Sequence, residues 1–289
     1  MWYITFMLPI VLALTGAIAW GSADFLGGRA SRAMSALGVA AISKVFGLIG
    51  VAILCVALTD FPGREEALWA AGAGIAGAAG IGLLYRALAL GPMSLVAPLT
   101  ACSGVVPVAV ALAGGETPGP LTAAGLVIAF VGGVIVSRPS EPQDGMPGME
   151  REGLLTALAA ALGIGISLTF LQQAASAPGD ATLGLTLVMA IATVVTLGSV
   201  LVARGGPFRV PGALLPAVVA CGVLDVSANA LFAKATADGE AAVVAVLASL
   251  YPVGTVLMAR VWLGERLSAG QSAGVVFAMV GVAAIAAGS

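Results

Sequence analysis

Asp225 is the most deeply placed ionisable residue in a long apolar stretch of this chain, and it is the first candidate for a chemical role. An ionisable side chain at mid-membrane depth costs about 2.5–3.5 kcal/mol on insertion scales, so it is a functional candidate by default. Asn229 lies four residues later on the same helix face, and Gly222 is expected to leave that face open beside the carboxylate. Burial disfavours the charged form of a carboxylate, so Asp225 is suited to taking up and releasing a proton. The alternative is a structural carboxylate that pairs with a lysine or arginine of another helix.

A second acidic residue, Asp24, lies near the end of the first apolar run, four residues after Trp20. Both are candidates for the site. Trp20 is expected either to anchor its helix at the membrane interface or to line a binding cavity. The alternative for Asp24 is an ordinary position close to water. Lys44, in the second run, is expected either to reach the surface along its apolar stem or to neutralise Asp24 or Asp225.

Prolines interrupt two of the apolar runs, and hydroxyl side chains lie beside them. Pro98 and Pro107 lie in one run, and Pro252 lies in another. A proline frees a backbone carbonyl and loosens the helix, and in transporters such breaks tend to mark the binding region or a hinge. The neighbouring hydroxyl groups are candidate substrate contacts, with helix–helix hydrogen bonds as the alternative for each. They are Thr100, Ser103, Ser249 and Tyr251.

The composition of the chain places these residues in a lipid bilayer. Of its 289 residues, 60% are hydrophobic and 9% are charged, against about 25% charged in an average soluble domain. The net charge of -2 argues against nucleic acid as a partner. The 3 cysteines stand alone in apolar runs and histidine is absent, so the sequence predicts no metal site, no cofactor and no enzyme.

Ten apolar runs approach the length of about 20 mostly apolar residues that a membrane span needs. The expected spans are 5–27, 35–58, 67–89, 93–113, 119–137, 153–174, 181–203, 212–235, 240–262 and 269–288. The first is too long for a signal sequence and has no basic leader, so it is expected to be a retained span. The longest polar segment, 138–152, is expected to link a first five-helix unit at 1–137 to a second at 153–289.

The two units are expected to be copies of each other, because the stretch 83–132 recurs after a shift of 148 or 149 residues. Under this shift Arg86 falls on Lys234, and Gly115-Glu116 falls on Gly264-Glu265; we expect both Gly-Glu segments to be structural turns. A second copy of an odd-numbered unit enters the membrane upside down. The sequence therefore predicts an all-α membrane protein of ten transmembrane helices, arranged as two inverted five-helix repeats around a central cavity, with binding at the seam.

Basic residues near the span ends predict how the chain is oriented. Ten of the 12 border the odd-numbered loops and two border the opposite side. This count places the odd loops in the cytoplasm and both termini outside. We expect a multi-pass protein of the inner (plasma) membrane, either a monomer or a homodimer.

Several segments resemble the drug/metabolite transporter superfamily, and specifically its EamA-like ten-helix branch. The resemblance covers nearly the whole chain and is strongest in five segments. They are Trp20 to Phe25, Tyr85-Arg86-Ala87-Leu88, Val96-Ala97-Pro98, Val106-Pro107-Val108 and Gly264-Glu265-Arg266-Leu267-Ser268. The first half departs from the pattern, since its Gly115-Glu116-Thr117-Pro118 lacks the usual basic residue.

The resemblance implies a basket of two inverted repeats around a cavity lined mainly by the first, third and fourth helices of each half, and it adds Tyr85 to the site candidates. It also implies export of amino acids, other metabolites or toxic compounds, or import of sugars. In many relatives both termini are cytoplasmic, the opposite of the orientation that the basic residues predict.

We therefore predict a secondary transporter of a small-molecule substrate, with export of amino acids or related amphipathic compounds by alternating access as the first hypothesis. Asp225 is the expected group for proton coupling or for binding the substrate amine, with Asn229, Trp20, Asp24 and Tyr251 around it. One alternative is a sugar or metabolite uniporter or importer without proton coupling. Another is a membrane enzyme or a scaffold subunit, and a fully packed seam between the halves would favour the scaffold.

Overall fold

The protein is all-helical throughout the part of the chain that the structure, a computed structural model, describes. That part comprises residues 2–58, 61–104, 106, 119–136, 149–175, 181–206, 209–239, 244, 247–248, 250–266 and 268–288. The helices of the first half are α1 (Trp2–Ser31), α2 (Ala36–Leu58), α3 (Arg64–Leu90), α4 (Met93–Ala101), the short 3-10 helix η1 (Cys102–Gly104) and α6 (Pro120–Val136). Those of the second half are α7 (Arg151–Ala175), α8 (Thr182–Ala203), α9 (Leu215–Asp238), α11 (Tyr251–Leu263) and α12 (Ala269–Gly288).

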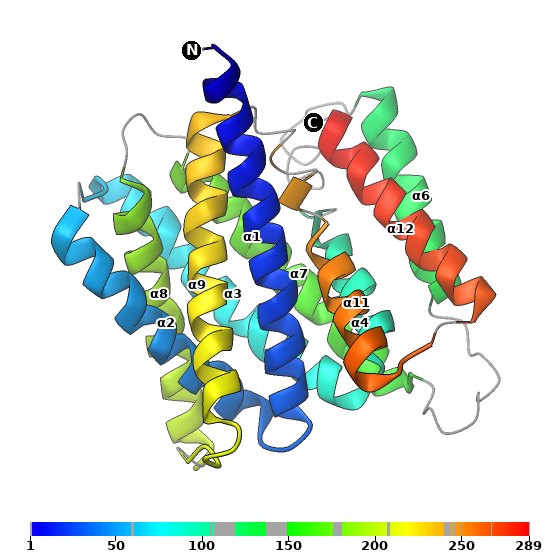
Figure 1. The fold of residues 1–289 in the computed structure, drawn as a ribbon, viewed down its shortest axis with the longest axis horizontal. Helices are drawn as coiled ribbons and strands as arrows, with labels where there is room; N and C mark the ends of the chain where they lie inside the picture. The colour runs from blue at the N-terminus through cyan, green and yellow to red at the C-terminus, as the bar shows by residue number, and fades with distance from the viewer. Residues whose placement is uncertain are drawn as a thin grey trace.

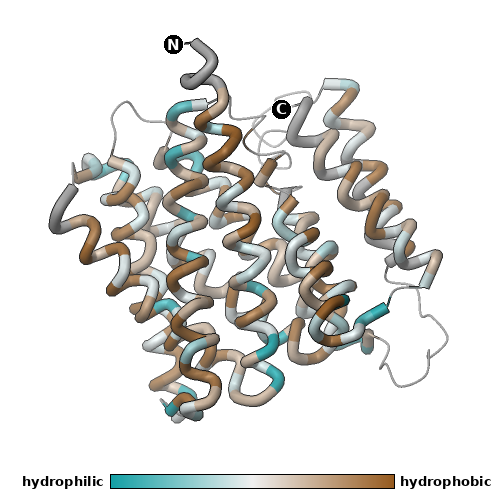
Figure 2. Tube along the Cα trace, in the orientation of Figure 1, coloured by the Kyte–Doolittle hydropathy of each residue, from teal (hydrophilic) through white to brown (hydrophobic). Residues whose placement is uncertain are grey.

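Six of these helices are long and apolar enough to cross a membrane: α1, α2, α3, α7, α8 and α9. Hydrophobic residues dominate their lengths in Figure 2, as expected for helices that contact lipid. α6, α11 and α12 coincide with parts of other predicted spans. Residues 105 and 107–113 of the fourth predicted span and several residues of 240–249 in the ninth lie outside the described part. The count of ten spans therefore stays a prediction.

The expected irregularities occur beside the prolines of both halves. Pro98 lies inside α4, which changes to the tighter η1 at Cys102. Pro252 lies in the first turn of α11, whose N-cap is Leu250. A proline is tolerated in the first turn of a helix because the backbone amide that it lacks would be unpaired there in any case. Pro107 lies outside the described residues.

The main helix contacts join the two halves of the chain. α1 packs on α9 and α3 packs on α7; α2 packs on α9 and α3 on α8; α1 packs on α11 and α4 on α7. α2 also packs on α8, α4 on α11 and α6 on α12. Figure 1 shows α6 and α12 side by side at one edge of the molecule and α2 and α8 together at the other. With α4 and η1 counted as one helix and the helices of each half numbered in order, exchanging the halves converts each of these contacts into another of them or into itself. α4 also packs on α12, and the described residues show no comparable contact between α6 and α11.

Glycines allow the helices from the two halves to approach closely. A β-carbon on Gly47 of α2 would lie 2.6 Å from the carbonyl oxygen of Gly222 of α9, and one on Gly222 would overlap the Ser43 carbonyl. At the α3–α7 crossing, a β-carbon on Gly163 would lie 2.8 Å from Cα of Gly80. Small residues let helix backbones touch in lipid, so these crossings fix where α2 meets α9 and α3 meets α7.

Candidate functional site

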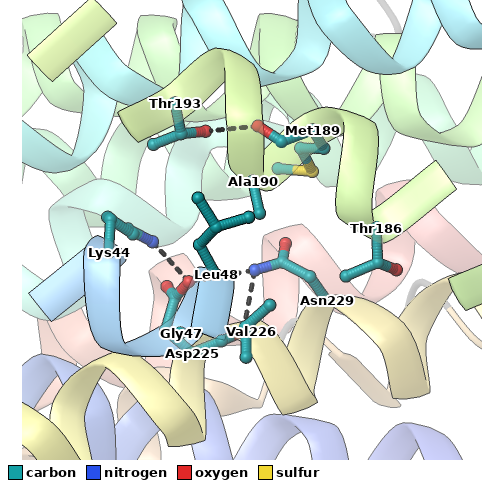
Figure 3. Close-up of a pocket in the computed structure, with 10 residues that line it drawn as sticks. All are labelled: Lys44, Gly47, Leu48, Thr186, Met189, Ala190, Thr193, Asp225, Val226 and Asn229. Carbon is teal, nitrogen blue, oxygen red and sulfur yellow. Dashed lines mark hydrogen bonds and ion pairs between the residues drawn. The ribbon is translucent and has the colours of Figure 1, made fainter. Parts of the chain in front are cut away.

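Asp225 lies in α9 and is buried, and its carboxylate forms an ion pair with Nζ of Lys44 from α2. One turn further along α9, Asn229 Nδ2 donates to Asp225 Oδ2 at 3.1 Å and to the Asp225 carbonyl oxygen at 2.8 Å. Figure 3 shows the three side chains converging from α2 and α9. Asn229 therefore shares the face of Asp225 as predicted. Lys44 has the neutralising role that was one of its two alternatives, and Asp225 has the structural partner that was its own alternative.

The glycine crossing explains why Lys44 and Asp225 meet. Gly47 follows Lys44 by three residues on α2, and Gly222 precedes Asp225 by three residues on α9, so the pair lies one turn from the point where the two backbones touch. The prediction that Gly222 leaves its helix face open is wrong, because the carbonyl group of Ser43 fills that space. A buried ion pair is weak support for stability, but removing one partner typically costs about 3–5 kcal/mol, since a charge is left unpaired.

Asp24 is buried, and its alternative as an ordinary residue near water is wrong. α1 continues past it to Ser31, and the residue is only 5% exposed. It lies within electrostatic range of both Asp225 and Lys44. Within the described residues no hydrogen bond or ion pair reaches its carboxylate. Of Asp225 and Asp24, the first therefore has a partner among the described residues and the second does not.

Trp20 contacts aromatic side chains from two helices of the other half. Its ring centroid lies 5.6 Å from that of Phe232 in α9 and 6.2 Å from that of Tyr251 in α11. The Tyr251 hydroxyl donates to Thr100 Oγ1 of α4 at 3.4 Å. Trp20 and Asp24 are four residues apart on α1, so these aromatic rings lie on the face that carries the unpaired acid.

Tyr85 of α3 is fully buried and lies between α1 and α9. Its ring covers Gly27 of α1, where a β-carbon would lie 2.7 Å from the phenolic oxygen. The Tyr85 hydroxyl lies 2.9 Å from Sγ of Cys221, one turn before Asp225 on α9. Tyr85 therefore belongs to the same cluster as the two acids.

The remaining hydroxyl candidates do not extend this cluster. Ser103 lies in η1, where its backbone is packed against Gly165 of α7. Ser249 lies outside the described residues. Thr255, which was not predicted, donates from Oγ1 to the Gly21 carbonyl oxygen at 3.0 Å and fastens α11 to α1.

A third buried acid, Glu265, was not expected to contact anything beyond its own turn. Its carboxylate accepts hydrogen bonds from the backbone amides of Met93 at 3.2 Å and Ser94 at 2.9 Å, at the N-terminus of α4. Arg32, just after α1, binds it at 3.0 Å and also donates to the Gly91 carbonyl oxygen at 3.1 Å. Gly264 ends α11 in the left-handed conformation with φ 67, the expected glycine stop. The only signal in the sequence was the recurrence of the Gly-Glu pair.

A small cavity borders the Lys44–Asp225 pair, between α2, α8 and α9 (Figure 3). Its volume is about 20 Å³ on a scale where one water needs about 10–15 Å³, so a single water fits. Its polar lining is Lys44, Thr186, Thr193, Asp225 and Asn229. This small cavity, which borders the second helix of each half, is distinct from the cavity lined by the first, third and fourth helices that the resemblance implied. That larger cavity stays a prediction. In the described part of the chain, no group of three or more His, Cys, Asp or Glu side chains could hold a metal ion.

Comparison with known proteins places the chain among membrane transporters. The model of the EamA-like transporter family matches residues 7–138 and again residues 151–287. A crystal structure with 18% sequence identity is similar over 96% of this chain and 96% of that chain, with a TM-score of 0.66. At this identity the likeness concerns the fold alone. A search of curated proteins found no match.

The apolar helices and the doubled match define a multi-pass membrane transporter of the drug/metabolite superfamily. The chain belongs to the EamA-like transporter family. The resemblance inferred from the sequence is thereby confirmed. Members of this family are transporters rather than enzymes, and their substrates are small molecules.

Proposed function

We propose that the protein is a proton-coupled secondary transporter that exports amino acids or related amphipathic amines across the inner (plasma) membrane by alternating access. The observation that carries this proposal is the cluster of Asp24, Asp225 and Lys44, buried where helices of both halves meet. Ionisable groups at membrane depth are rare and mark substrate or proton pathways. An acid without a partner can bind a proton or an ammonium group, which links the movement of the two.

The pattern of helix contacts supports two inverted repeats, 1–137 and 153–289, as the moving parts. Most of the contacts between the halves are preserved when the halves are exchanged, as a two-fold axis between them would require. In transporters with inverted repeats, substrate sites lie near the bilayer midplane at the interface of the repeats. The acid cluster lies at this interface, because its residues come from α1 and α2 of one half and α9 of the other.

Flux measurements in proteoliposomes test this function. The purified protein is reconstituted with a pH gradient, and a panel of amino acids, monoamines and sugars is offered. We expect an amine or amino acid to move against the proton flow, and a protonophore to abolish its accumulation. A substrate flux that does not depend on the pH gradient would overturn proton coupling and favour the uniporter. No transport of any of the three classes would overturn the proposed substrate class.

A further inference from the structure

We propose that Asp24, rather than Asp225, is the carboxylate that exchanges a proton for the substrate's ammonium group, and that Lys44 is a fixed counter-ion of Asp225. This inference rests on the proposed function and assigns the roles of the two acids. It reverses the expectation from the sequence, in which Asp225 was the coupling residue.

The first argument is the difference between the partners of the two acids. The Asp225 carboxylate binds Lys44 Nζ and accepts a hydrogen bond from Asn229 Nδ2 at 3.1 Å. The negative charge of Asp225 is thus balanced by a cation, and one of its oxygens accepts from an amide. In the described part of the chain, the Asp24 carboxylate has neither kind of partner, although the residue is as deeply buried.

The second argument is a difference in how the helices cross. α2 and α9 touch backbone to backbone at Gly47 and Gly222, one turn from the ion pair, so Lys44 stays beside Asp225 as long as these helices move together. The contact of α1 with α9 at Gly16 is looser. A β-carbon there would lie 3.5 Å from the Ala228 carbonyl oxygen, which is an ordinary van der Waals distance. α1 is close to α9 at another point, where a β-carbon on Gly239 would lie 2.6 Å from Cβ of Pro9. The glycine crossing therefore explains why Lys44 stays beside Asp225, and no cation is held beside Asp24 in the same way.

The third argument is the charge balance around Asp24. The ionisable groups that face it come from every helix packed against α1: Lys44 of α2, Tyr85 of α3, Cys221 and Asp225 of α9, and Tyr251 of α11. The phenols and the thiol are neutral groups, so among the residues that the structure describes two carboxylates face a single cation. One positive charge is missing, and an uncompensated buried charge is costly. A proton on Asp24 supplies that charge in the empty site.

The same balance defines the class of substrate. A monovalent ammonium group can replace the proton on Asp24 without changing the charge of the site, and the proton leaves to water as the ammonium binds. The Trp20 and Tyr251 rings can provide aromatic faces to the cation. A zwitterionic amino acid brings no net charge, so it would need to retain the proton as well. The balance therefore favours an amine without a free carboxylate, in one-for-one exchange with a proton.

Four variants separate the roles of the two acids: Asp24→Asn, Asp225→Asn, Lys44→Met, and the double variant Lys44→Met/Asp225→Asn. The first readout is infrared spectroscopy of the purified protein, which detects a protonated carboxyl group without any transport. We expect this band to be present in the wild type and in the double variant, and to be lost in Asp24→Asn. A band that persists in Asp24→Asn but disappears in the double variant would assign the proton to Asp225 and overturn the proposal.

The second readout is exchange of an amine, probed with tyramine, for protons in proteoliposomes. Asp24→Asn is expected to abolish exchange. Asp225→Asn is also expected to abolish it, because the released Lys44 ammonium pairs with Asp24, and adding Lys44→Met should restore it. Failure of this rescue in a double variant with the melting temperature of the wild type would overturn the role given to Lys44. If the wild type itself exchanges nothing, the proposed function fails, and the infrared result still decides which acid carries the proton.

Discussion

Gly222 lies where the backbones of α2 and α9 touch, and an added β-carbon has less room there than at the other glycines near the acid cluster. Replacing Gly222 therefore tests the crossing that holds Lys44 beside Asp225. A β-carbon there would overlap the Ser43 carbonyl, whereas one on Gly50, in the same pair of helices, would meet nothing within 4 Å. We expect Gly222→Ala to destabilise the protein by about 1–3 kcal/mol through overpacking. Gly50→Ala should be neutral or slightly stabilising, because alanine is the better helix former.

Thermal unfolding in detergent compares the two substitutions. Equal melting temperatures for the two variants would mean that α2 and α9 can separate at no cost, and Lys44 would then not be held in place. A lower melting temperature for Gly222→Ala alone would support a rigid crossing.

At the scale of single residues, the sequence identified the side chains of the acid cluster but did not determine which of them are in contact. The spacing of four residues placed Asn229 beside Asp225, because that relation is local to one helix. The partner of Lys44 stayed open between alternatives, because the approach of α2 to α9 depends on two glycines far apart in the chain. The burial of Asp24 was not predicted, because the polar and glycine residues after it indicated the end of a span, whereas α1 continues to Ser31.

Among the helices, the contact of Glu265 with Arg32 ties the start of α4 to the turn before α12. Glu265 is 6% exposed and accepts hydrogen bonds from two backbone amides at the positive end of the α4 dipole. We expect Glu265→Gln to lower stability by about 1.5–3 kcal/mol, because it weakens charge-assisted hydrogen bonds and leaves Arg32 without its anion. Any opening between α4 and α11 at this end must also stretch this contact.

Glu152 provides a matched control, since it pairs with Arg86 while both side chains are more than half exposed at 57% and 54%. Exposed pairs contribute about 0–1 kcal/mol, so Glu152→Gln should change the melting temperature little. Similar losses in Glu265→Gln and Glu152→Gln would show that the Glu265 contact is an ordinary surface pair. The recurrence of Gly-Glu could predict the turn at Gly264, but not the distant amides that the carboxylate caps.

At the scale of the whole molecule, the repeat was predictable because the stretch 83–132 recurs in the second half of the sequence. The family match falls on both halves, and most of the helix contacts between them are preserved when the halves are exchanged. The small cavity beside Asp225 was not predictable, because its position depends on how the two halves pack. The space beside Asp225 opens toward α2 and α8, the second helices of the two halves.

The charge balance of the buried site gives a pH dependence for ligand binding by the whole protein. If a proton and an ammonium group compete for Asp24, lowering the pH favours binding of the proton and weakens binding of the ammonium ligand. The apparent Kd of an amine then rises by up to about tenfold for each pH unit over the range in which Asp24 is protonated in the empty protein. A ligand present at 100 times its Kd stabilises the folded state by about 2.7 kcal/mol. If its Kd rises tenfold at the same concentration, this stabilisation falls to about 1.4 kcal/mol.

Melting temperatures measured with and without tyramine across a pH series test this competition. We expect the ligand-induced rise to shrink as the pH falls, and to be weak at every pH in Asp24→Asn. An uncharged sugar should show no such trend, because it does not exchange with a proton. A rise that stays constant with pH in the wild type, for a ligand that binds and is transported, would mean that proton and substrate do not share one carboxylate. The two would then occupy separate sites, and the unpaired charge of Asp24 would need a different partner.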